Sequence, residues 1–165
     1  NWDMILHTLN GFLAAAIGFS LIDILNSTEK FHIKMSPIFV ALVSFCFSMT
    51  VGVAWEFFEY TADSLLSTDM QKDTVVNKIS SVNLTNANAF EPKIITGIDE
   101  TSIHYGNDTI TIPDGYLDIG LIDTMEDLIV NFIGAVTFSI LGYFYIKKRD
   151  KYKGIEHFIP QKKKA

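Results

Sequence analysis

Three long apolar stretches constrain this chain more than any other feature of its sequence. They cover about Met4 to Leu25, Pro37 to Thr61 and Leu121 to Ile146. Each is long enough to cross a bilayer as a helix of about 20 residues. Pro37 fits the first turn of the second stretch, and Ser36 before it is a suitable cap. We therefore expect an all-α polytopic membrane protein with three transmembrane helices in this chain.

Charge is distributed unevenly along the chain and predicts an orientation. Residues 147–165 hold eight of the 13 Lys and Arg, whereas residues 64–120 are acidic. Because cytoplasmic flanks favour Lys and Arg, we expect the first of these segments to be a basic cytoplasmic tail and the second an extracytoplasmic insertion. The predicted parts are the first two transmembrane helices (1–63), the acidic insertion (64–120), the third helix (121–146) and the tail (147–165).

The insertion contains one segment with a clear β pattern. In TSIHYGNDTITIPDG, alternating residues flank YGND and the segment ends at Pro113-Asp114-Gly115, which predicts a β-hairpin. The part before it, residues 67–90, is polar and Asn-rich with little periodicity. Cys46 is the only cysteine and lies within an apolar stretch, so we expect no disulfide and a buried thiol.

The second apolar stretch carries polar residues along one helical stripe. Its end, VAWEFFEYTADS, presents Glu56, Glu59 and Asp63 within two turns. Steps of three and four residues keep them on one face. The same face continues toward the start of the stretch with small residues, which are Gly52, Ser48 and Ser44.

The first and third stretches carry stripes of the same kind. Asp3 and His7 open the first, and Asp123 and Asp127 open the third. Small residues follow on each face and would let the helices approach closely; they are Gly11, Ala14, Ala15, Gly18, Gly134, Ala135 and Gly142. In the predicted orientation, the polar residues of all three helices lie at one depth, about 5–10 Å below the outer boundary.

Acidic side chains at this depth need something to offset their repulsion. A charged side chain at the bilayer centre costs about 2.5–3.5 kcal/mol on the insertion scale. Lys and Arg are absent from the three apolar stretches. The available solutions are a bound cation, a protonated His7, or acids that retain their protons.

The motifs WDMILHTLNGF, WEFFEYTAD and DTMEDLIVNFIGA resemble those of the YjdF-like uncharacterised integral membrane proteins of bacteria. The residues that carry this resemblance are Asp3, His7, Gly11, Glu56, Glu59, Asp123, Thr124, Asp127, Gly134 and Ala135. The resemblance implies a bacterial plasma (inner) membrane protein with further helices upstream of Asn1, and no established activity. The long 64–120 insertion departs from that family, whose linker is usually short. A fainter likeness to VanZ-like proteins rests on a Trp-Glu and Asp-x-x-x-Asn-x-x-Gly scheme.

The polar residues suggest a divalent-metal site near the outer face, because His and carboxylates are ligands for Zn, Mn or Fe. With an open coordination position, a metal-dependent hydrolase of lipid or cell-envelope precursors is the expected enzyme class; no catalytic residue is assigned. The predicted ligands are His7, Glu56, Glu59 and Asp127, with Asp3, Asp63, Asp123 and Asn131 as neighbouring or alternative ligands.

Two other hypotheses stay open. The same residues suit a purely structural polar network that fixes the helix register, or a proton- or cation-coupled transporter. Of the inner halves of the helices, only Asp23 offers a further polar step. The expected partners are the lipid bilayer, helices upstream of Asn1 and a second copy of the chain in a homo-oligomer. No nucleic-acid motif is visible.

Overall fold

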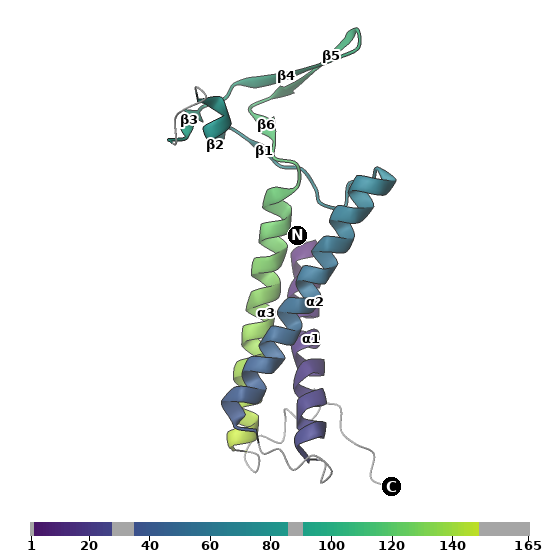
Figure 1. Ribbon diagram of the computed structural model, residues 1–165, viewed down its shortest axis with the longest axis vertical. Helices are drawn as coiled ribbons and strands as arrows, with labels where there is room; N and C mark the ends of the chain where they lie inside the picture. Colours follow the sequence, from purple (N-terminus) through teal and green to yellow (C-terminus); the bar gives the residue numbers. More distant parts are fainter. Residues whose placement is uncertain (1, 28–34, 86–90, 149–165) are drawn as a thin grey trace. The chain divides into compact units, whose positions relative to one another are not determined.

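The computed structural model describes residues 2–27, 35–85 and 91–148. Its helices are α1 (Trp2–Ser27), α2 (Pro37–Leu66) and α3 (Leu121–Lys147) (Figure 1). Within these residues, three helices are long and apolar enough to cross a membrane, which confirms the predicted class of polytopic membrane protein. The predictions for Asn1 and for residues 149–165 of the tail lie outside the described residues.

The start of α2 follows the predicted cap. The backbone N–H of Phe39 donates to the Ser36 hydroxyl at 3.3 Å and to the Ser36 carbonyl at 3.0 Å. Pro37 is the first helical residue, where its missing N–H has no helical partner to lose. The far end differs, because α2 continues to Leu66 and so passes the predicted end at Thr61.

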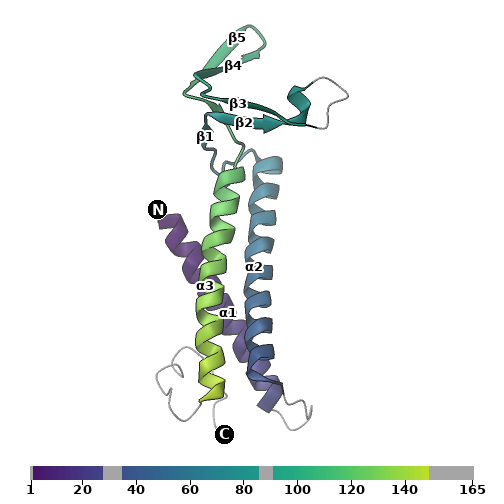
Figure 2. The same cartoon turned by 90° about the vertical axis from the view of Figure 1, so that its left-hand side faces the viewer.

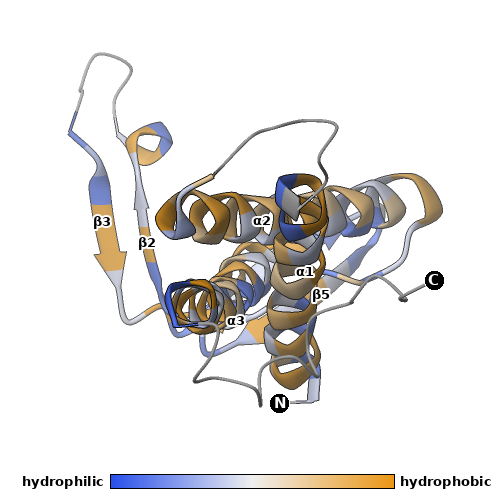
Figure 3. Cartoon of the chain, turned by 90° about the horizontal axis from the view of Figure 1, so that it is seen from below, coloured by the Kyte–Doolittle hydropathy of each residue, from blue (hydrophilic) through white to orange (hydrophobic). Residues whose placement is uncertain are grey.

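The described chain divides into two compact units. The helical unit contains α1, α2 and α3 from Met125 onward, and the insertion unit contains residues 67–124. Within the helical unit the helices lie side by side, and α1 crosses α3 obliquely (Figure 2). The helices consist mostly of hydrophobic residues (Figure 3), and many of these are exposed; Leu9, Leu13 and Ile17 of α1, for example, are each about half exposed. Such surfaces suit contact with lipid.

The core between the helices is small and partly aromatic. Phe19 of α1 and Phe138 of α3 are fully buried, with ring centroids 5.9 Å apart in an edge-to-face arrangement. Val40 of α2 and Tyr145 of α3 belong to the same buried cluster. This cluster occupies the half of the helical unit that contains the end of α1 and the start of α2.

Small residues on the predicted stripes allow the helices to touch. A Cβ on Gly134 of α3 would collide with the Thr8 carbonyl of α1. The Ser48 hydroxyl of α2 donates to the Gly11 carbonyl of α1 at 2.7 Å, and the Ser44 hydroxyl donates to the Ala15 carbonyl one turn further on. These contacts set both the spacing and the axial position of α1 against its neighbours.

The expectation for Cys46 is wrong, because this residue is exposed on α2. The reason is helical geometry. Cys46 lies midway between Ser44 and Ser48, which are buried against α1, and a step of two residues turns the side chain about 200° around the helix. An apolar neighbourhood in the sequence therefore did not mean a buried position.

The insertion unit contains the predicted hairpin. Strands β4 (Glu100–Tyr105) and β5 (Asp108–Pro113) pair antiparallel, with Tyr105 opposite Asp108. The two-residue turn between them begins at Gly106, whose φ is +57°, as hairpin turns with glycine in the first position require. This confirms the prediction from TSIHYGNDTITIPDG.

Four shorter strands in the insertion unit were not predicted. Strand β1 (Val75–Val76) pairs with β6 (Tyr116–Leu117), and β2 (Lys78–Ser81) pairs with β3 (Lys93–Thr96). A single 3-10 turn, η1 (Val82–Leu84), follows β2. Strands of two to four residues are too short to show a period of two in the sequence.

Candidate functional site

Within the helical unit, the four predicted metal ligands fall into two groups that share one residue. Glu56, Glu59 and Asp127 form one group, and Asp3, His7 and Asp127 form another; within each group the candidate ligand atoms lie within 4.8 Å of one another. Asp127 belongs to both. The helical period explains the first group, because a step of three residues keeps Glu56 and Glu59 on one face of α2.

The shared residue is the best buried of the acids. Asp127 is 3% exposed, and Glu56 and Glu59 are also buried. His7 Nε2 lies 3.3 Å from Asp127 Oδ2 and 3.8 Å from Asp3 Oδ1. The Asp3 side chain is 42% exposed. The polar cluster therefore runs from a partly exposed acid at the start of α1 to a fully enclosed set between the three helices.

Trp55 contacts the Glu59 carboxylate, and sequence reasoning missed this contact. Its indole N–H donates to Glu59 Oε1 at 2.8 Å. The two residues are four apart on α2, so the helix places them next to each other. The stretch WEFFE shows this spacing, but no role for Trp55 followed from it. Its contact orients Glu59 toward the cluster.

Asn131 lies one turn along α3 from Asp127. Its carboxamide fits between two glycines: a Cβ on Gly11 would stand 2.7 Å from Asn131 Oδ1, and one on Gly52 would stand 2.6 Å from Asn131 Nδ2. Asn131 Nδ2 also donates to Met49 Sδ at 3.5 Å. Asn131 thus packs all three helices together directly below the acids.

Asp123 has a different partner from the one expected. It belongs to the insertion unit, where its Oδ2 accepts the backbone N–H of Lys72 at 3.1 Å. The next residue, Thr124, accepts from Gln71 Nε2 at 2.7 Å. The Asp-Thr motif at the start of α3 therefore ties down the beginning of the insertion. Asp63, on α2, is in neither ligand group among the residues that the structure describes.

Asp118 is a second residue that sequence reasoning missed. One carboxylate oxygen accepts the Thr74 N–H at 2.7 Å and the other accepts the Ile122 N–H at 2.7 Å. The second bond caps the first turn of α3. Burial alone would raise the pKa of Asp118, but the backbone N–H groups of Thr74, Ile122 and Gly120 together hold that pKa below its ordinary value.

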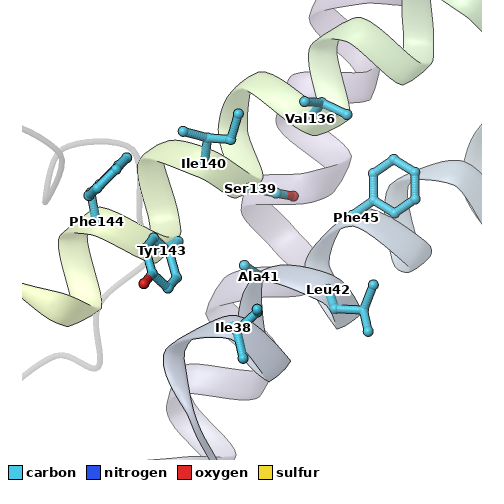
Figure 4. Close-up of a pocket in the computed structure, with 9 residues that line it drawn as sticks. All are labelled: Ile38, Ala41, Leu42, Phe45, Val136, Ser139, Ile140, Tyr143 and Phe144. Carbon is cyan, nitrogen blue, oxygen red and sulfur yellow. The ribbon is translucent and has the colours of Figure 1, made fainter.

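The described helices line cavities of two kinds. One, of about 330 Å³, opens between α1 and α2 beside the cluster, and its lining includes His7, Trp55 and Asn131. The other, of about 540 Å³, lies between α2 and α3 (Figure 4). Its lining is apolar apart from Ser139 and Tyr143. Of these two cavities, the first brings a predicted ligand, His7, to its wall.

Membrane-length helices that enclose a His–carboxylate cluster define a polytopic membrane protein with a polar site between its helices. The chain belongs to the family described as predicted membrane protein (DUF2238), which matches residues 1–148. The match includes all three helices and the insertion. No curated protein and no solved structure matches the chain. The likeness to VanZ-like proteins has no support from these comparisons.

Proposed function

We propose that this protein binds a divalent metal ion with His7, Glu56, Glu59 and Asp127. The observation that carries the proposal is the position of Asp127, which lies within reach of ligands from both other helices. His7 comes from α1 and the two glutamates come from α2. One cation at Asp127 would offset the charges of three carboxylates, and the three apolar stretches contain no Lys or Arg.

The distances support a transition metal. His7 Nε2 and Asp127 Oδ2 are 3.3 Å apart. Two ligands that each lie about 2.1 Å from a tetrahedral zinc ion are separated by about 3.4 Å. Nitrogen and carboxylate oxygen together suit Zn, Mn or Fe better than Ca or Mg, which take oxygen ligands. The proposed cofactor is one of these three metals.

The transporter hypothesis receives less support from the packing. A cation that left the cluster toward the other end of the helices would meet the buried cluster of Phe19, Val40, Phe138 and Tyr145. The serine hydroxyls on that route, Ser44 and Ser48, already donate to backbone carbonyls. A purely structural network remains the main competing explanation, since Trp55 and Asn131 make contacts that would also stabilise the helices without a metal.

The finer parts of the proposal follow from the resemblance and from charge. We assign the protein to the YjdF-like group, in the bacterial plasma membrane, with the cluster near the outer face and the basic tail in the cytoplasm. The cavity beside His7 gives a bound metal an open side. An open position is what a metal-dependent hydrolase of lipid or cell-envelope precursors would need.

Elemental analysis of the detergent-purified full chain tests the metal site. We expect close to one equivalent of Zn, Mn or Fe per chain in the wild type and a loss of most of it in His7→Ala and Glu56→Gln. Asp23→Asn is the matched control, because Asp23 is an acid on α1 near the opposite end from His7. It should retain the metal.

Two outcomes would overturn the proposal. One is a wild-type protein that contains no metal and takes up none from Zn, Mn or Fe solutions. The other is that the site variants keep their metal but lose thermal stability, which would leave the structural network as the role of the cluster. Size-exclusion profiles of all variants separate a lost site from a lost fold.

A further inference from the structure

The cavity between α1 and α2 is polar at one end and apolar at the other. His7, Asn10 and Asn131 line the polar end, whereas Leu13 and Ile17 line the rest of the α1 wall. Leu13 and Ile17 are each about half exposed on the outer surface of α1. The cavity is therefore open to the bilayer along an apolar side, and only an amphipathic molecule matches its whole lining.

The order of these residues along α1 matches the order of groups in a phospholipid. A helix of 26 residues is about 39 Å long, somewhat more than the hydrocarbon thickness of about 30 Å. His7 therefore lies just inside one hydrocarbon boundary and Ile17 lies near the midplane. A lipid of that leaflet has its headgroup at the depth of His7 and its acyl chains at the depth of Leu13 and Ile17.

A buried amide lies at the polar end. Asn131 is 4% exposed and lines the cavity. Among the described residues its hydrogen bond is the donation to Met49 Sδ at 3.5 Å, and a sulfur atom is a weak acceptor. A carboxamide has two N–H donors and a carbonyl acceptor, so Asn131 keeps hydrogen-bonding capacity for a ligand in this cavity.

We infer that the cavity binds a membrane glycerophospholipid, with its phosphate beside His7 and Asn131 and one acyl chain along Leu13 and Ile17. The inference rests on the proposed metal site, because the carboxylates of Glu56, Glu59 and Asp127 would repel a phosphate in the absence of a cation. With the metal bound, the phosphate is the group placed next to it, which makes a phospholipid the substrate class of the site.

The other cavity provides an internal comparison. The groove between α2 and α3 is larger, but its lining has no His, Asn or acid (Figure 4). Ser139 is its one buried hydroxyl, and within the described residues this hydroxyl has no hydrogen-bond partner. The groove therefore lacks the His, amide and carboxylates that would hold a metal and a phosphate beside it, and we expect lipid in it to exchange as freely as bulk lipid.

Photolabelling in nanodiscs tests the inference. The full chain is reconstituted with and without Zn in phosphatidylglycerol that carries a diazirine in one acyl chain, and labelled peptides are mapped by mass spectrometry. We expect label on the segments that contain Leu13, Ile17 and Val51. Leu13→Trp should reduce it at least fivefold. Leu42→Trp is the matched control, because Leu42 is 56% exposed against 53% for Leu13 and lines the other groove; it should change nothing.

The zinc content of each sample separates the two proposals. Zinc present with no preferential label, or with equal effects of the two tryptophan variants, overturns the lipid site and leaves the metal site standing. Zinc absent from the wild type overturns both. A Leu13→Trp variant that changes the oligomeric state but not the labelling would instead assign this face to contact between copies, and would also overturn the lipid site.

Discussion

The carboxamide of Asn131 on α3 lies so close to Gly52 on α2 that a Cβ on the glycine would stand 2.6 Å from Asn131 Nδ2. Real Cβ atoms do not approach a neighbour so closely, and overpacking in a core typically costs about 1–3 kcal/mol. We therefore expect Gly52→Ala to lower the free energy of unfolding by that amount. Thermal unfolding in detergent measures the change.

A double-mutant cycle identifies the cause of this loss. Asn131→Ala removes the group that the new methyl would meet, so Gly52→Ala should cost much less in that background. An equal cost in both backgrounds would show that Asn131 is not the neighbour that requires a glycine at position 52.

Asp127→Asn should abolish metal binding, while Asp123→Asn should leave it intact. The residues are one turn apart on α3, but Asp127 belongs to both ligand groups and Asp123 accepts the Lys72 N–H. Loss of a group that merely supports a ligand often costs about 10–100-fold in metal affinity, so we expect at least that from Asp127→Asn. Isothermal titration with Zn measures both variants. Equal losses would mean that Asp123 is a ligand as well.

Zinc binding should change the fluorescence of Trp55. Its indole N–H donates to Glu59 Oε1, and a metal at Glu59 alters the charge that this indole experiences. A zinc titration should shift or quench the emission of the wild type and of Trp2→Phe. The signal should disappear in Trp55→Phe. If the signal follows Trp2 instead, the metal does not bind at Glu59.

The start of the insertion should loosen in acid. Because the pKa of Asp118 is held below its ordinary value, its ionised form is the one that the folded state favours. Its contribution is present above the ordinary carboxyl value of about 3.9 and is lost as the pH falls through the lower folded value. At neutral pH, Asp118→Ala should therefore speed hydrogen exchange at the Thr74 and Ile122 amides.

The difference in exchange between Asp118→Ala and wild type should depend on pH. Relative to wild type at the same pH, the effect of Asp118→Ala on exchange should shrink below about pH 4. Asp69→Ala is the control, since Asp69 is an exposed acid of the same insertion unit, and it should leave both amides protected. A difference between Asp118→Ala and wild type that stays constant down to low pH would rule out the carboxylate charge as the cause.

The helices and the candidate site could be predicted from the sequence because their signals are local. Apolar length fixed the spans, and steps of three and four residues placed Glu56 and Glu59 on the face that meets α1 and α3. His7 and Asp127 joined them because helices of similar length bring residues of equal depth to one level. The structure places two groups of these residues around Asp127, whereas their role as ligands and the metal itself stay predictions.

What the sequence did not predict depends on partners far apart in the chain. Lys72 and Asp123 are 51 residues apart, and Val75 pairs with Leu117 across a comparable distance. A single sequence contains no signal that matches such pairs. Trp55 was missed for another reason: its helical position was clear, but the rotamer that turns the indole to Glu59 is chosen by packing.

The Ser44 and Ser48 hydroxyls of α2 limit where residues can be inserted into α1. Ser44 and Ser48 bond to α1 at Ala15 and Gly11 and so fix that part of α1 in place. One residue inserted between His7 and Gly11 would turn His7 by 100° and raise it by about 1.5 Å, away from Asp127. An insertion before Asp3 would leave His7 and Asp127 in their present positions. Residues can therefore be added before Asp3 or within the insertion without disturbing the polar cluster. They cannot be added in the single turn that joins His7 to Gly11.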